Sequence, residues 1–159
     1  MSLRISLATL FCGLAAALIG GTPGAARAAD ATLKFHVFVP PVTPIYKRLY
    51  EPWAKKVEAD SKDRIKIDMY PLMQLGGRPP QLIDQVRDGV AEVTHTIAGY
   101  TPGRFPKLEV FELPFVVTTT TPTNFAMTEF AGKYMQDELA DYKIVLLHMH
   151  PGDVFHSRK

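Results

Sequence analysis

Apolar and polar positions alternate along the chain in a way that predicts several strands. Residues 33–39 and 65–69 alternate, and they are rich in the β-branched and aromatic side chains typical of strands. Residues 90–97 predict a third strand. The nearly continuous apolar run 143–148 predicts a last strand that is covered on both faces.

Helical patterns lie between these strands. Thr43 and Pro44 are typical of a helix start, and apolar residues follow at helical spacing up to Val57. Pro52 interrupts this pattern, so the helix is either kinked there or restarts as a second helix. Two further helices are predicted, one from Pro79 to Gly89 and one over residues 121–139.

The order of these elements predicts the fold class. Strands that alternate with helices form a mostly parallel sheet with right-handed crossovers. We therefore expect an α/β lobe with helices on both faces of the sheet, and residues 99–107 as a loop.

The first 28 residues have the pattern of an export signal. Arg4 precedes an apolar run over residues 5–20, and a small-x-small cleavage site, Ala26-Arg27-Ala28, follows it. The run is shorter than the roughly 20 apolar residues of a membrane span. We expect cleavage after Ala28 and a periplasmic chain of residues 29–159; an uncleaved anchor is the alternative.

Composition narrows the possible functions of the cleaved chain. The single cysteine, Cys12, lies within the predicted signal, so the mature chain has no thiol for a disulfide, a metal ligand or a nucleophile. The formal net charge is +2, and cleavage removes Arg4 and Arg27, which brings acidic and basic side chains into balance. Neither nucleic acid nor a membrane surface is therefore an expected partner.

Candidate chemistry lies at the carboxyl ends of the predicted strands, where ligands bind in open α/β sheets. These ends place residues 38–43, 74–78, 95–100 and 148–153 on one rim. Turn chemistry alone is the alternative for any single residue there. No nucleophile elbow and no phosphate-binding Gly-rich loop is present, and no two carboxylates have a persuasive catalytic spacing. A metal site is conceivable for His148, His150 and His156, but a hydrogen-bonded histidine at a strand end fits better.

Five short blocks occur in an order that is known from a protein family. The chain resembles the DctP-type solute-binding proteins of TRAP transporters, from about Leu33 to its last residue. The blocks are residues 53–57 (WAKKV), 70–77 (YPLMQLGG), 88–92 (DGVAE), 99–106 (GYTPGRFP) and 111–115 (FELPF).

This resemblance implies a periplasmic receptor that is not an enzyme and uses no cofactor or metal. Two α/β lobes would close on a small organic acid, usually a carboxylate, and deliver it to the membrane subunits of a sodium-coupled TRAP permease. The cleaved chain would be the N-terminal lobe, with the second lobe and the main clamping arginine beyond Lys159. The implied ligand residues are Phe38, Pro41, Thr43, Gly77, Arg78, His95, Thr96, Ile97, Tyr100 and Asp153.

Two alternatives to a transport receptor remain open at this point. One is the ligand-binding input domain of a sensor, which would continue into a transmembrane or signalling segment. The other is a small periplasmic metal-dependent hydrolase that uses the three C-terminal histidines. The turn at residues 151–153 (PGD) also departs from relatives that carry an arginine there, which puts that ligand contact in doubt.

Overall fold

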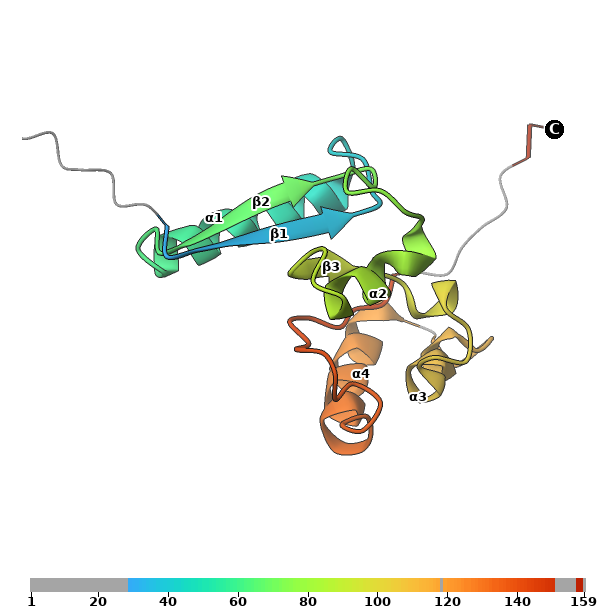
Figure 1. The fold of residues 1–159 in the computed structure, drawn as a ribbon. Coiled ribbons are helices and arrows are strands. Elements are labelled where there is room, and N and C mark those ends of the chain that lie inside the picture. Colours follow the sequence, from blue (N-terminus) through green and yellow to red (C-terminus); the bar gives the residue numbers. More distant parts are fainter. Residues whose placement is uncertain (1–28, 118, 151–156, 159) are drawn as a thin grey trace, which may run out of the picture.

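A computed structural model describes residues 29–117, 119–150 and 157–158 of the chain. The predicted export signal, Asp153 and His156 lie outside the described residues. Three parallel strands form the sheet: β1 (Ala31–Val37), β2 (Ile65–Tyr70) and β3 (Val93–His95), in the order β2-β1-β3 (Figure 1). The predicted parallel α/β arrangement is confirmed.

The two crossover connections run in opposite directions from the central strand. The chain passes from β1 through α1 (Glu51–Asp60) to β2, and then through η2 (Pro79–Gln81) and α2 (Leu82–Arg87) back across β1 to β3. Right-handed crossovers in opposite directions place their helices on opposite faces of a sheet. The side chains of β1 follow this division, because Phe35 and Val37 join the core against α1 while His36 contacts α2.

The main core lies between the sheet and the first helical segment. Phe35 packs edge-on against Tyr50 and Trp53, with ring centroids 5.0 and 5.5 Å apart. Val37 and Ile67 complete the sheet side of this core. Full burial of an apolar side chain contributes about 1.5 to 3 kcal/mol, so this cluster stabilises the strand pair and its helix together.

Pro52 divides the first helical segment in two. A π-helical turn, η1 (Tyr46–Tyr50), precedes α1, and Pro52 lies in the first turn of α1. Proline has no N–H and its ring crowds the carbonyl four residues earlier, which a wider turn relieves. Of the two predicted outcomes the structure shows the restart, and the π turn leaves both Tyr46 and Tyr50 buried.

Two predicted elements differ from the structure. The third strand covers Val93–His95 and not residues 90–97, because the amides of Val90 and Ala91 bond to the Gln85 carbonyl at the end of α2. The strand predicted at 143–148 is wrong, since these residues are irregular. A short apolar run does not define a strand without a pairing partner, and Val145 and Leu146 are 63% and 58% exposed here.

The segment after β3 holds short helices that the sequence patterns did not predict. They are η3 (Ala98–Tyr100), α3 (Pro106–Glu109) and η4 (Val110–Glu112), and they fall in or near the predicted loop. The last helix, α4 (Thr120–Tyr134), starts close to its predicted position but ends five residues before Leu139. Within the described ranges, no helix combines the length and apolar character needed to cross a membrane.

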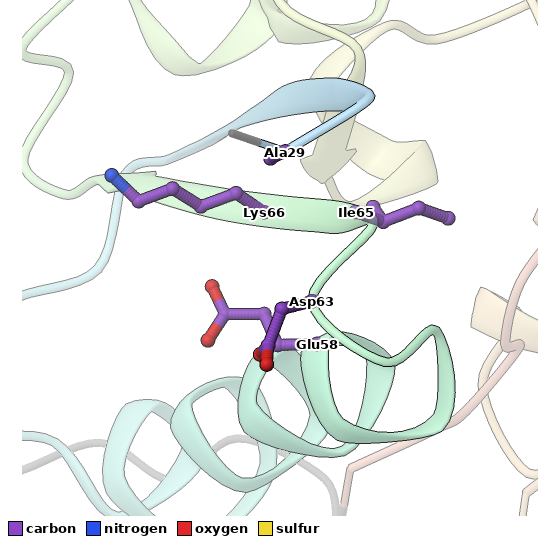
Figure 2. Close-up of a pocket in the computed structure, with 5 residues that line it drawn as sticks. All are labelled: Ala29, Glu58, Asp63, Ile65 and Lys66. Carbon is purple, nitrogen blue, oxygen red and sulfur yellow. The ribbon is translucent and has the colours of Figure 1, made fainter. Parts of the chain in front are cut away.

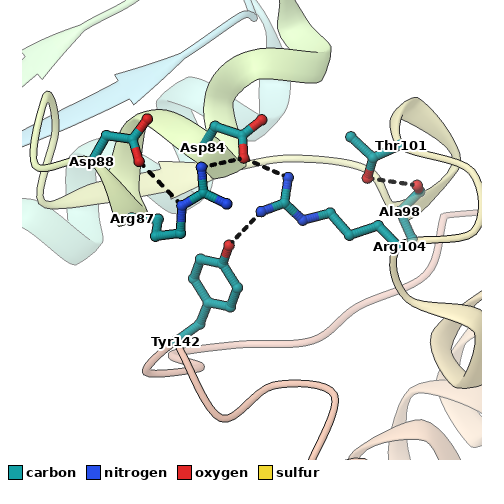
Figure 3. A network of polar contacts seen from close by, with 7 residues as sticks. All are labelled: Asp84, Arg87, Asp88, Ala98, Thr101, Arg104 and Tyr142. Atoms are coloured by element: carbon teal, nitrogen blue, oxygen red, sulfur yellow. Dashed lines mark hydrogen bonds and ion pairs between the residues drawn. The ribbon is translucent and has the colours of Figure 1, made fainter.

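An ion-pair network joins α2 to the later part of the chain. Figure 3 shows the Arg104 guanidinium between two partners: it donates to the Asp84 carboxylate at 2.7 Å and to the Tyr142 hydroxyl at 2.8 Å. Arg87 pairs with Asp84 and with Asp88 on the same side. This network holds the loop that follows β3 against α2.

Candidate functional site

Three of the predicted ligand residues, Phe38, His95 and Tyr100, lie together where the strand order reverses. The chain leaves β1 towards β2 on one side, whereas β3 pairs with the other side of β1, so the strand order reverses between β1 and β3, where open α/β sheets usually bind ligands. Phe38 directly follows β1, and His95 is the last residue of β3. Topology therefore brings together two residues that are 57 positions apart in the chain.

Five ring side chains form a cluster at these strand ends, and we call it the aromatic cluster. Phe38 stacks on His95 with ring centroids 6.0 Å apart and meets Tyr100 edge-on at 5.5 Å. His95 stacks in turn on His148 at 5.2 Å and contacts Tyr50 at 5.6 Å. The aromatic cluster thus consists of Phe38, Tyr50, His95, Tyr100 and His148.

Hydrogen bonds connect the polar members of the aromatic cluster. The Tyr50 hydroxyl lies 2.7 Å from His95 Nδ1, and His95 Nε2 lies 3.1 Å from His148 Nε2. One of the two facing nitrogens must carry the proton that bonds them, so the imidazoles have complementary tautomers. Tyr50 on one side and His148 on the other therefore fix the orientation of the His95 ring.

The aromatic cluster is uncharged at neutral pH. Burial, together with the neighbouring His148, lowers the pKa of His95 to about 4. Burial and the nearby His150 also lower the pKa of His148, and burial raises the pKa of Tyr50. The cluster therefore offers aromatic faces and neutral hydrogen-bonding groups, a surface suited to a ring and not to an anion.

A cationic group lies on a different loop, which we call the β2 loop (residues 71–78). Arg78 is exposed at its end, and its backbone N–H donates to Gln81 Oε1 at 2.8 Å. Its guanidinium forms no hydrogen bond or ion pair with the residues that the structure describes. Arg78 is thus a cation without a protein partner in this part of the chain.

Two successive glycines shape the β2 loop. Gly76 and Gly77 have φ angles of +86° and +82°, a backbone conformation that residues with a side chain rarely adopt. A Cβ at Gly77 would lie 2.8 Å from Gln85 Nε2, whereas a Cβ at Gly76 would meet nothing within 4 Å. Gly77 therefore allows a close approach between the loop and α2, in addition to its φ angle.

This difference predicts unequal effects of two alanine substitutions. Gly76→Ala is expected to cost about 1 to 2 kcal/mol through its φ angle alone. Gly77→Ala should destabilise the protein further, because Gln85 must also move. Urea unfolding of both variants measures the difference, and equal losses would show that the contact with Gln85 has no energetic weight.

Other predicted ligand residues do not belong to the aromatic cluster. The Thr43 hydroxyl donates to the Pro40 carbonyl at 2.7 Å within its own turn, and Pro41 is exposed. Ile97 is half-buried, and the buried Thr96 hydroxyl has no partner among the described residues. The structure thus brings together Phe38, His95 and Tyr100.

Sequence patterns did not single out several residues that the structure places at the rim. Tyr50, which belongs to the core and also contacts His95, was given no place at the rim, whereas His148 was expected there as the end of a strand that the structure does not contain. His36, which is fully buried, and Gln85 were not considered. A useful indication for Tyr50 was available, since a buried tyrosine hydroxyl normally has a hydrogen-bond partner.

Two surface hollows are lined by residues outside the aromatic cluster. One, of about 250 Å³, is lined by Ala29, Glu58, Asp63, Ile65 and Lys66 at the amino ends of the strands (Figure 2). The other, of about 310 Å³, lies beside Gly99 and contains Glu109 and Glu112. Both glutamates accept hydrogen bonds from backbone amides, which accounts for their positions.

The described residues also bear on the metal-site alternative. No group of three or more His, Cys, Asp or Glu side chains among them could hold a metal ion. His148 Nε2 is engaged with His95, and His156 falls outside the described ranges.

Comparison with known proteins identifies the relatives of this chain. Residues 35–154 match the family model DctP, described as bacterial extracellular solute-binding protein, family 7. The chain is similar to the outer membrane transporter protein TsaT of Comamonas testosteroni, with 27% identity over 146 residues, which cover 91% of this chain and 43% of TsaT.

Two solved structures of TRAP solute-binding proteins are also similar. One, from an unidentified microbe of a marine metagenome, is specific for aromatic acid ligands and holds 3-hydroxybenzoate; it has 47% identity and a TM-score of 0.71, over 75% of this chain and 37% of that protein. The other, from Rhodoferax ferrireducens, holds copurified benzoate, with 44% identity and a TM-score of 0.71, over 74% and 36%. The chain thus spans less than half the length of these relatives.

Proposed function

Because the chain belongs to the DctP family of bacterial extracellular solute-binding proteins, we propose that it is a lobe of a TRAP receptor for a small aromatic carboxylate. The observation that carries this proposal is the uncharged aromatic cluster at the point where the strand order reverses. The resemblance inferred from the five sequence blocks is confirmed by the family match. The receptors similar to this chain are binding proteins, which favours transport over the sensor and hydrolase alternatives.

The aromatic cluster would receive the ring of the ligand. Aromatic pairs gain about 0.5 to 1.5 kcal/mol beyond the burial of their area, and Phe38 and Tyr100 supply both a face and an edge. Neutral His95, whose two ring nitrogens are engaged with Tyr50 and His148, would keep the cluster in place beside the ligand without adding a charge. Support for an aromatic ligand also comes from the two relatives that hold 3-hydroxybenzoate and benzoate.

Arg78 would provide the charge that the aromatic cluster lacks. Its guanidinium has no ion-pair partner among the described residues, and arginine binds carboxylates through two parallel hydrogen bonds. The buried Thr96 hydroxyl is a further donor without a partner in the described part of the chain. Hinge closure of a second lobe would then exclude water, and the closed receptor would deliver its ligand to the membrane subunits of a permease.

Calorimetric titration tests this proposal directly. The purified chain should bind benzoate and 3-hydroxybenzoate more tightly than succinate, and Phe38→Ala should reduce this preference by removing a stacking partner. The same titration is made on a chimera in which residues 29–150 replace the matching lobe of the Rhodoferax receptor. That receptor then supplies the rest of the full-length protein. Loss of aromatic-acid binding in that chimera, with its fold intact, would contradict the proposal.

Export is a further part of the proposed function. The apolar run and the Ala26-Arg27-Ala28 site predict cleavage after Ala28. Periplasmic protein from an expressing bacterium should begin at Ala29 when its N-terminus is sequenced. Recovery of intact Met1 in the membrane fraction would indicate an uncleaved anchor instead.

A further inference from the structure

A buried histidine connects the central strand to the β2 loop. His36 lies on β1, on the face opposite the main core, and is 0% exposed. The Leu75 amide N–H donates to His36 Nε2 at 3.3 Å. Nε2 is therefore the acceptor nitrogen of the ring, which leaves Nδ1 as the donor.

Gln85 on α2 completes this connection. His36 Nδ1 lies 2.7 Å from Gln85 Oε1, and the Gln85 amide nitrogen donates to the Gly76 carbonyl at 3.0 Å. Each group meets a complementary partner, because reversing the amide would oppose two donors at His36 and two acceptors at Gly76. The β2 loop is thus fastened at two successive residues through one strand and one helix.

We infer that Gln85 is a positioning residue, which acts with His36 to hold the β2 loop in the shape that presents Arg78 at the rim. The loop needs such support because Gly76 and Gly77 both have left-handed backbone conformations and little intrinsic rigidity. Gln85 also approaches Gly77 so closely that a Cβ there would clash. The role in ligand binding rests on the proposed function, whereas the shape of the loop does not.

Hydrogen exchange tests the shape of the loop without any ligand. In Gln85→Ala, the His36 ring loses its Nδ1 partner and the Gly76 carbonyl loses its donor, so the Leu75 amide should exchange about tenfold faster. Gln85→Met, which keeps the length of the side chain, serves as a second variant if the alanine protein does not fold. Unchanged exchange at Leu75 in a folded variant overturns the inference.

A double-mutant cycle tests whether the effect passes through Arg78. Gln85→Ala should weaken benzoate binding by about tenfold, and it should have little further effect in an Arg78→Ala background. Additive losses overturn the positioning role, since they would mean that Gln85 acts independently of Arg78. The control is Arg87→Ala, which removes surface ion pairs from the same helix without touching the loop.

The experiments distinguish a failure of the proposed function from a failure of this inference. If the unsubstituted chain and its chimera bind none of the aromatic acids, that function is refuted, and the Leu75 exchange rate alone decides the inference. Faster exchange in Gln85→Ala then supports the loop-holding role, and unchanged exchange refutes it.

Discussion

Arg78→Ala is expected to weaken binding of an aromatic carboxylate by about 1.5 to 3 kcal/mol, the usual contribution of a hydrogen bond to a charged group. The guanidinium is exposed and has no ion-pair partner among the described residues, so its removal should disturb the fold little. Arg78→Lys should recover part of the loss, because lysine keeps the charge but cannot form the bidentate pair. Calorimetric titration with benzoate, in the chain and in the chimera, measures both variants.

A control on a different surface separates this effect from net charge. Lys56→Ala removes an exposed cation on α1 whose partner is Asp60, four residues along the same helix. Its effect on binding should be negligible at physiological salt, where distant exposed charges are screened. Equal affinity in Arg78→Ala and the unsubstituted protein would remove Arg78 from the site and assign carboxylate binding to other groups.

The sheet and the position of its carboxyl-end rim could be predicted because each follows from local patterns. Alternation over residues 33–39 and 65–69 marks two strands that the structure contains, and the intervening helices require a parallel arrangement. The pairing of β1 with β3, which sets Val37 opposite His95, then places Phe38 beside His95. The resemblance to a solute-binding family predicts ligand residues at the same rim.

What could not be predicted depends on contacts between distant segments. Residues 143–148 have the composition of a buried strand, yet His148 instead reaches the aromatic cluster from an irregular segment. No periodicity indicates that contact, because it is made across 53 positions of the chain. The contacts of Gln85 could not be predicted for a similar reason, since its partners are a strand residue and a loop carbonyl.

Some missed elements did carry an indication in the sequence. Pro106 precedes Lys107-Leu108-Glu109, and proline in the first helical turn is a common start, so the short helix α3 was within reach of sequence reasoning. The presence of two prolines and two glycines in residues 99–107 favoured a loop instead. The structure shows that these breakers separate short helical turns and do not exclude them.

Acid should destabilise the protein through His95. Its pKa is about 4 in the folded chain and near 6.5 when unfolded, so the unfolded state binds more protons between these values. The stabilisation is therefore fully present above pH 6.5, is lost as pH falls towards about 4, and amounts to at most about 3 kcal/mol. His148, which faces the ring, also has a lowered pKa and adds a loss of the same sign, while Tyr50 stays neutral throughout this range.

The measurement compares how the free energy of unfolding changes with pH in two proteins. Urea unfolding at about pH 7 and at about pH 4.5 gives this change for the unsubstituted chain and for His95→Phe, which keeps a stacking ring but has no titrating group. Ordinary carboxylates titrate equally in both proteins, so the difference between the two changes reports the contribution of His95 together with its effect on His148. His95→Phe should lose markedly less stability on acidification, even if its stability at neutral pH is lower through the lost bond to Tyr50. An identical loss in both proteins would show that the pKa of His95 is the same in the folded and the unfolded protein, and the aromatic cluster would then gain a positive charge in mild acid that also attracts the ligand carboxylate.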